Sequence, residues 1–269
     1  MLFRSSLEFG ELVGLRNPDV IHHLAILQPS ASDSLSITRS LPALLGVLEA
    51  ARRHRVGRVV VAIPAGLLYG EIEAKFQPVK EGRRTEAIGV SHVMAHTMVD
   101  VLNVYRERYG IEFCALAMSN VYGVRQRPQD GVVAAFASAV VQGIDAEIFG
   151  SGKQTRDFLY IDDAVDGVVR AIDRLVHAPG SVSGHAINLG TGTGTTLLEA
   201  ATLVAKAAGI EPYFELGTIR VGEISQYVAD LAKAHDLLGY VPQFPSSRGI
   251  PLAYQWWRQW HYGESPAVT

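Results

Sequence analysis

Three side chains that can exchange protons recur at four-residue intervals within residues 89–109: His92, His96 and Asp100. Residues four apart share one face of an α-helix, so Asp100 can orient His96, and His92 can act as an acid or a base near neutral pH. The two histidines also have the spacing of two metal ligands, although no third ligand is obvious. We favour a solvated or interface role for these histidines over acid-base use, and acid-base use over metal binding.

The elements that must position these residues alternate between short β-branched runs and longer amphipathic segments. This alternation is typical of β-α units around a parallel sheet. Strands are predicted over residues 20–25, 58–63, 112–118, 158–161 and 185–189, and helices over residues 41–54, 89–109, 131–143, 163–176 and 196–208. The sequence therefore predicts an α/β fold.

The composition argues against several classes of function. The 269 residues carry 24 Lys and Arg against 27 Asp and Glu, without a long run of either sign. We therefore expect no nucleic-acid partner and no membrane partner. The one cysteine, Cys114, lies in an apolar run, so no intrachain disulfide is expected and a reducing, cytoplasmic location fits best. No segment has the features of a targeting signal or a membrane span.

Six further motifs follow one another in an order that resembles one enzyme family. They lie at residues 20–25, 69–71, 119–126, 150–158, 188–192 and 220–223, and they include Tyr-Gly-Glu, Asn-Val-Tyr-Gly and Asn-Leu-Gly-Thr-Gly. The chain resembles the extended short-chain dehydrogenase/reductase family, the NAD-dependent epimerases and dehydratases of sugar nucleotides such as the UDP-glucose 4-epimerases. The resemblance covers nearly the whole chain.

The resemblance implies a Rossmann-like parallel sheet followed by a smaller α/β substrate-binding part. We expect residues 1–125 to form the first part, and residues 126–269 the second, with Rossmann elements interleaved at about 155–177. The family's first three strands and its glycine-rich pyrophosphate turn have no counterpart before residue 20, so we expect a truncated sheet. A second glycine-rich turn, at residues 190–195, is interpreted as a helix start capped by Thr195 or Thr196.

The family's catalytic positions hold other residues in this chain. Residues 87–92 resemble the Tyr-Gly-x-Ser-Lys box, but Ile88 replaces its tyrosine and His92 its lysine, and Ala65 stands where the family has a Ser or Thr. An aliphatic side chain has no proton to give. The resemblance therefore predicts a site that uses no NAD and no other cofactor, in which His92 could still act as an acid or a base.

The ligand-binding positions of the family are kept. The resemblance assigns the diphosphate and sugar to Asn120, Arg156 and Arg220, and places Phe149 near the base. Converging guanidinium groups can clamp a phosphate through bidentate hydrogen bonds. This predicts a small anionic ligand, such as a nucleotide sugar or a biosynthetic intermediate. The alternative is purely structural, with Arg156 paired to Asp157 or Asp162 and Arg220 paired to Glu223.

The expected truncation makes residues 20–25 an edge strand. An apolar edge with unpaired backbone groups tends to associate, so we expect it to be covered by residues 2–15 or by another chain. The helices at 41–54 and 89–109 resemble the pair that forms the family's dimer interface. A homodimer is therefore expected, and a heterodimer with an intact relative remains open.

Three functions remain open at this stage. The first is a non-redox family member that binds or transforms a nucleotide sugar, by acid-base chemistry of an isomerase or lyase type if it is an enzyme. The second is a non-catalytic partner of an active homologue or biosynthetic enzyme. The third is an ordinary NAD-dependent epimerase whose gene start is misplaced, which would require a tyrosine where Ile88 stands.

Overall fold

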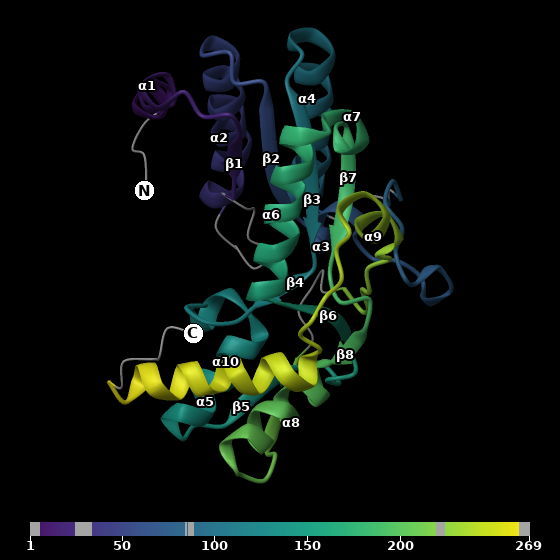
Figure 1. Cartoon of the computed structure of the whole chain (residues 1–269). Coiled ribbons are helices and arrows are strands. Elements are labelled where there is room, and N and C mark those ends of the chain that lie inside the picture. The colour runs from purple at the N-terminus through teal and green to yellow at the C-terminus, as the bar shows by residue number, and fades with distance from the viewer. Residues whose placement is uncertain (1–5, 25–33, 84, 86–88, 219–223, 264–269) are drawn as a thin grey trace.

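The structure, a computed structural model, describes residues 6–24, 34–83, 85, 89–218 and 224–263. Its largest element is a four-stranded parallel sheet in the order β1-β2-β3-β7 (Figure 1). The strands are β1 (Ile21–His23), β2 (Arg58–Pro64), β3 (Glu112–Met118) and β7 (His185–Leu189). Within the described residues, β1 lies at one edge of this sheet.

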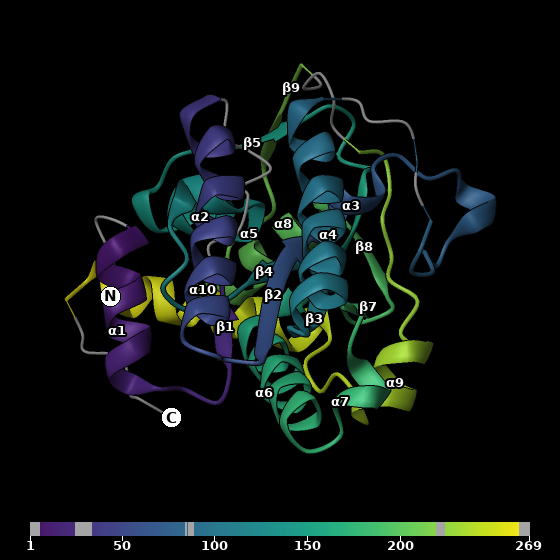
Figure 2. The ribbon, with the colours of Figure 1, turned by 90° about the horizontal axis from the view of Figure 1, so that it is seen from above.

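Helices cover both faces of the sheet (Figure 2). On β2, Val59, Val61 and Ile63 join one apolar cluster, whereas Val60 and Ala62 join another. The first cluster includes buried residues of α2 (Ser34–Arg53) and α4 (Val90–Tyr109), and the second includes those of α6 (Ile161–His177) and α9 (Ala232–Leu238). A parallel strand that is buried on both faces reads as a continuous apolar run, which explains why β2 and β3 were recognisable in the sequence.

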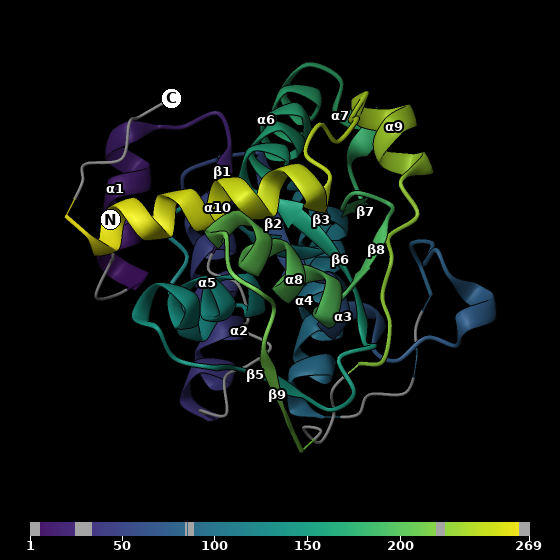
Figure 3. The ribbon, with the colours of Figure 1, turned by 90° about the horizontal axis from the view of Figure 1, so that it is seen from below.

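A third apolar cluster lies in the lower part of the molecule, between three helices (Figures 1 and 3). These helices are α5 (Val132–Gln142), α8 (Leu197–Ala208) and α10 (Ser246–His261). Beside them lie a sheet in the order β4-β6-β8 and a parallel pair, with strands β4 (Asn120–Tyr122), β6 (Thr155–Tyr160), β8 (Gly194–Thr196), β5 (Ala146–Phe149) and β9 (Phe214–Gly217). The division of the chain at residues 125 and 126 stays a prediction.

Short elements complete the described structure. They are α1 (Ser6–Arg16), α3 (Ala65–Tyr69), α7 (Pro179–Val182) and two 3-10 turns, Ala74–Phe76 and Pro128–Asp130. Helix α1 packs against α2, and its Val13 is buried in the cluster shared with the sheet. The N-terminal segment therefore folds back onto the body of the protein. Among the described residues, no helix combines the length and the apolar character that a membrane crossing needs.

The α/β prediction is confirmed, with shifts at the ends of several elements. Strands 112–118 and 185–189 occur as predicted, and strand 20–25 is shorter than predicted, with Ala25 outside the described residues. The short strands β4, β5, β8 and β9 were not predicted, because three or four residues are too few to show a periodicity. Helix α10 was missed because Pro251 lies inside it and resembles a helix breaker.

Candidate functional site

Ala65 and Asn120 lie at the same end of the large sheet. Pro64, the last residue of β2, is the Cα partner of Met118, the last residue of β3. Ala65 follows directly as the first residue of α3 and is completely buried, and Asn120 begins β4 and is exposed. The carboxyl ends of parallel strands are the usual ligand-binding edge of an open α/β sheet. The methyl group of Ala65 fills space in this region but can neither donate nor accept a hydrogen bond.

His92 lies in the first turns of α4, against the turn at Tyr69 and Gly70. Gly70 has a φ of 66°, and a Cβ atom added to it would lie 3.7 Å from Cδ2 of His92. Both ring nitrogens of His92 are buried, and neither has a hydrogen-bond partner among the described residues. Burial and the neighbouring His96 lower the pKa of His92, so its imidazole is neutral at pH 7. A neutral imidazole has one nitrogen that donates and one that accepts, and among the described residues neither is used in a hydrogen bond.

His96 has a structural role instead. Its Nε2 lies 2.7 Å from the carbonyl oxygen of Leu68, so this nitrogen carries the hydrogen and donates it. The bond ties the start of α4 to α3. Asp100 lies one turn further along α4 and is exposed, and its predicted role in orienting His96 stays a prediction. Among the described residues no group of three His, Cys, Asp or Glu side chains has the arrangement of a metal site.

The buried histidines predict a loss of stability in mild acid. Burial lowers the pKa of His22, His23, His92 and His185 below the ordinary value of 6.5. In mild acid the unfolded chain therefore binds more protons than the folded protein does. The free energy of unfolding should consequently fall as the pH drops below about 6.5. Urea unfolding at pH 7.5 and 5.5 measures this loss.

The matched variants for this measurement are His23→Asn and His177→Asn. His23 is buried, whereas His177 is exposed on the last turn of α6. The change in unfolding free energy between the two pH values should be smaller in His23→Asn than in the wild type, and no such reduction is expected in His177→Asn, which removes an exposed side chain. Equal changes in all three proteins would contradict the assignment.

Tyr69 belongs to the structural frame of the site rather than to its chemistry. Its hydroxyl donates to Oδ1 of Asn188 at 2.6 Å, and Nδ2 of Asn188 donates to the carbonyl oxygens of Val79 and Asp230 at 2.8 and 3.2 Å. Burial raises the pKa of Tyr69 above its ordinary value, so its hydroxyl stays protonated at neutral pH and keeps donating this bond to Asn188. The network joins β7 to the turn that contacts His92.

Residues 224–230 lie beside this network and form bridges both with Thr155 of β6 and with Val79. The carboxylate of Glu71 accepts hydrogen bonds from the backbone N–H and the hydroxyl of Ser225. The ring of Tyr227 stacks on that of Tyr69 with 6.1 Å between the centroids, and Ala229 forms a bridge with Val79. Glu71 was noticed in the sequence only as part of the Tyr-Gly-Glu motif. Its partner lies 154 positions away, so no local signal could identify the contact.

Asp157 organises the glycine-rich turn at residues 190–195. Its Oδ1 accepts from the backbone N–H and the hydroxyl of Thr191 at 2.7 and 2.8 Å, and its Oδ2 accepts from the N–H groups of Gly192 and Ala229 at 3.0 and 3.1 Å. These bonds occupy the N–H groups of Thr191 and Gly192, which a phosphate bound at this turn would need. Thr196 caps α8 in a capping box with Glu199, which confirms the interpretation of this turn.

The predicted anion-binding residues lie on neighbouring strands. Asn120 is the Cα partner of Phe158, and Arg156 precedes Phe158 by two residues on the same face of β6. Strand geometry separates the Cα atoms of Asn120 and Arg156 by about 8 Å. Arg156 is half-buried, and its Nη1 donates to the carbonyl of Thr155 at 3.0 Å.

Phe149, the residue predicted to lie near the base of the ligand, is half-buried at the end of β5. Ile88 and Arg220 lie outside the described residues.

Comparison with known proteins places the chain among sugar-nucleotide enzymes. Residues 5–190 match the family described as the NAD dependent epimerase/dehydratase family. The chain is 32% identical to a UDP-glucose 4-epimerase of Mycolicibacterium smegmatis over 93% of its own length and 80% of that protein.

Two solved structures show the same arrangement of elements. A Thermotoga maritima UDP-glucose 4-epimerase with UDP-glucose superposes with a TM-score of 0.87 at 25% identity, covering 96% of this chain and 82% of that one. A Bacillus cereus UDP-glucuronic acid 4-epimerase in complex with UDP-glucuronic acid and NAD gives a TM-score of 0.85 at 26% identity, with coverage of 96% and 81%.

Proposed function

Because the chain belongs to the NAD dependent epimerase/dehydratase family, we propose that it binds a nucleotide sugar or a related anionic molecule and acts on it without exchanging hydride with NAD. The single observation that carries this proposal is the combination of Ala65, Ile88 and His92 at the family's catalytic positions beside a kept Asn120 and Arg156. Solved relatives hold UDP-sugars and NAD. The residues of this chain fit the first ligand and do not fit the redox use of the second.

The misfit with redox chemistry follows from the residue types at the family's catalytic positions. Hydride exchange at a sugar hydroxyl requires a group that takes and returns the hydroxyl proton, together with a cation that stabilises the ionised form of that group. Ala65 offers only a buried methyl group, and Ile88 offers an aliphatic chain. His92 is neutral at pH 7 because burial and His96 lower its pKa, so it does not supply the cation.

Ligand binding is supported by the placement of Asn120 and Arg156. Both lie where β4 and β6 begin, beside the carboxyl end of the large sheet. A guanidinium makes charge-assisted hydrogen bonds to phosphate oxygens, and the exposed amide of Asn120 can donate to a sugar or phosphate oxygen. Arg220 is proposed as the second cation of this clamp from the sequence.

Isothermal titration calorimetry with UDP-glucose, UDP and NAD tests the proposed function. We expect the wild-type protein to bind UDP-glucose and UDP, and Arg156→Ala to weaken both by about tenfold or more, because the lost hydrogen bonds involve charged groups. Arg53→Ala is the matched control, since Arg53 is exposed on α2 and lies 3.9 Å from Glu49. Stoichiometric binding of NAD, or binding of neither UDP compound, would refute the proposal.

We also propose that the protein forms a homodimer through α2 and α4. The two helices lie side by side on one face of the sheet (Figure 2), and Val90, Val93 and Val104 of α4 are about half exposed or more. Val93→Asp combined with Val104→Asp should convert a dimer to a monomer in light scattering, because two carboxylates would be buried in each half of the interface. Val165→Asp with Val169→Asp on exposed positions of α6 is the control.

The light-scattering experiment also tests the alternative function, in which the protein is a non-catalytic partner of another protein. β1 lies at a sheet edge within the described residues and could bind a different chain. A monomer in the wild type would contradict the homodimer, and co-purification of an intact homologue would favour the heteromeric alternative.

A further inference from the structure

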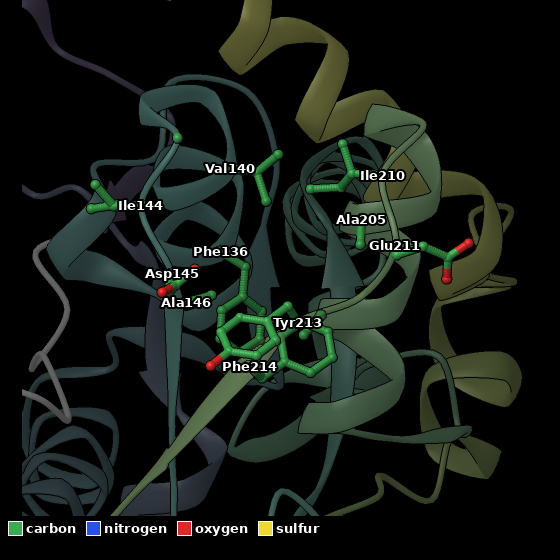
Figure 4. Close-up of a pocket in the computed structure, with 12 residues that line it drawn as sticks. Phe136, Val140, Ile144, Asp145, Ala146, Ala205, Ile210, Glu211, Tyr213 and Phe214 are labelled. Atoms are coloured by element: carbon green, nitrogen blue, oxygen red, sulfur yellow. The ribbon is translucent and has the colours of Figure 1, made fainter.

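A small hollow opens on the lower part of the molecule, away from the predicted clamp. It has a volume of 190 Å³ and lies between α5 and α8, where β5 and β9 begin (Figure 4). Ala146 at the start of β5 and Phe214 at the start of β9 line it, whereas Phe149 lies at the other end of β5. The hollow is therefore a surface distinct from the proposed nucleotide-sugar site.

The walls of the hollow are apolar, and several of its side chains are exposed. Val140 and Ile210 face each other across the opening, with the ring of Phe136 among the residues deeper inside (Figure 4). Ile144, Ile210 and Tyr213 are 58%, 50% and 66% exposed. A gathering of exposed apolar side chains around a depression indicates a contact surface. The volume is below the usual range of small-molecule sites, so the hollow suits one inserted side chain rather than a nucleotide.

The negative charges beside the hollow favour a partner with positively charged side chains. Asp145 and Glu211 are exposed and line the hollow from opposite sides. They are the charged residues among the described residues that line the hollow, and no lysine or arginine is among these. A negative border around an apolar depression is complementary to a segment that carries positive charge next to an apolar side chain.

We propose that this hollow is a docking site for a segment of a partner protein that inserts one apolar side chain between α5 and α8 and places lysine or arginine beside Asp145 and Glu211. Apolar burial in the hollow supplies contact area, and the two carboxylates set the orientation and the preference for a basic segment. The site is independent of the nucleotide-sugar proposal, because none of its lining residues belongs to the predicted clamp.

Fluorescence anisotropy with a labelled peptide, acetyl-Lys-Lys-Leu-Lys-Lys-amide, tests the docking site. The charge-neutral variant combines Asp145→Asn with Glu211→Gln. Neither carboxylate has a hydrogen bond or ion pair among the described residues, so the variant should fold as the wild type does. We expect it to bind the peptide about tenfold more weakly. Ile210→Ser, which removes one apolar wall, should also weaken binding.

The matched control combines Glu147→Gln with Glu215→Gln. These residues are Cα partners in the β5-β9 pair and alternate with Ala146 and Phe214, so they lie on the opposite face of the pair from the hollow. The control removes the same total charge as the test variant and should change peptide affinity less than about twofold.

Four outcomes would overturn the docking proposal. Equal weakening by the control variant would show a general charge effect, and equal binding of acetyl-Glu-Glu-Leu-Glu-Glu-amide would show that the negative border selects nothing. Absence of peptide binding would remove the site. Self-association of the wild type that is lost in Ile210→Ser would instead identify a second copy of this chain as the occupant.

Binding of UDP-glucose is unaffected in each of these cases if the proposed function holds. Failure of the docking proposal and failure of the proposed function are therefore distinguishable.

Discussion

Replacing Asp157 with alanine is expected to lower the free energy of unfolding by about 3–5 kcal/mol. The side chain is completely buried and accepts four hydrogen bonds, three of them from the backbone N–H groups of Thr191, Gly192 and Ala229. An alanine would leave these donors without their partner and a gap between three segments of the chain. Burial raises the pKa of Asp157, and the hydrogen bonds from these residues act in the opposite direction.

Urea unfolding of Asp157→Ala and Asp157→Asn measures this contribution. The asparagine variant should also be destabilised, because its NH2 group replaces one of the two carboxylate oxygens. That group would then face backbone N–H donors from which it cannot accept a hydrogen bond. Asp145→Ala is the control, since Asp145 is exposed and a surface substitution of this kind usually changes stability by less than about 0.5 kcal/mol. A loss below about 1 kcal/mol in Asp157→Ala would show that the turn at residues 190–195 does not depend on this carboxylate.

Replacing His92 with glutamine should slow proton transfer by the protein by about 10²–10⁴-fold. Since the site is proposed to work without a hydride acceptor, it can remove a carbon-bound proton only where the substrate already carries a neighbouring keto group. His92 is suited to this step because its ring is neutral and both nitrogens lack partners among the described residues.

Proton NMR of UDP-4-keto-6-deoxyglucose in D2O measures this step as loss of the C–H signals beside the keto group. The wild type should catalyse deuterium exchange, His92→Gln should not, and the exposed His177→Gln should match the wild type. Binding of UDP should be retained in His92→Gln, which separates loss of proton transfer from loss of fold. Exchange that persists in His92→Gln, or that is absent from the wild type, would contradict a role of His92 as acid or base.

Local patterns predicted the parts of this fold that lie within one element. The apolar runs of β2 and β3 and the spacing of Leu44 and Leu48 on α2 identified a buried sheet and the helix that covers it. The threonine before α8 identified a helix start, and the capping box with Glu199 confirms it. These features depend on residues a few positions apart, so the sequence contains the whole signal.

The candidate site could be predicted only in part, because its contacts join distant segments. The motifs located Ala65, His92, Asn120, Phe149 and Arg156, but gave no indication that His96 donates to Leu68 or that Asp157 accepts from the 190–195 turn.

The amino-acid sequence by itself determined the family, the α/β class and the side chains available at each family position, since each of these depends on residue identity and on short spacing. The tertiary structure alone decided which of those groups are free to act. His92 and His96 are equivalent in the helical pattern, yet packing against α3 gives His96 a carbonyl partner and leaves His92 with none among the described residues. Hydrogen bonding and burial in a folded chain depend on neighbours that are remote in sequence, and local patterns do not record them.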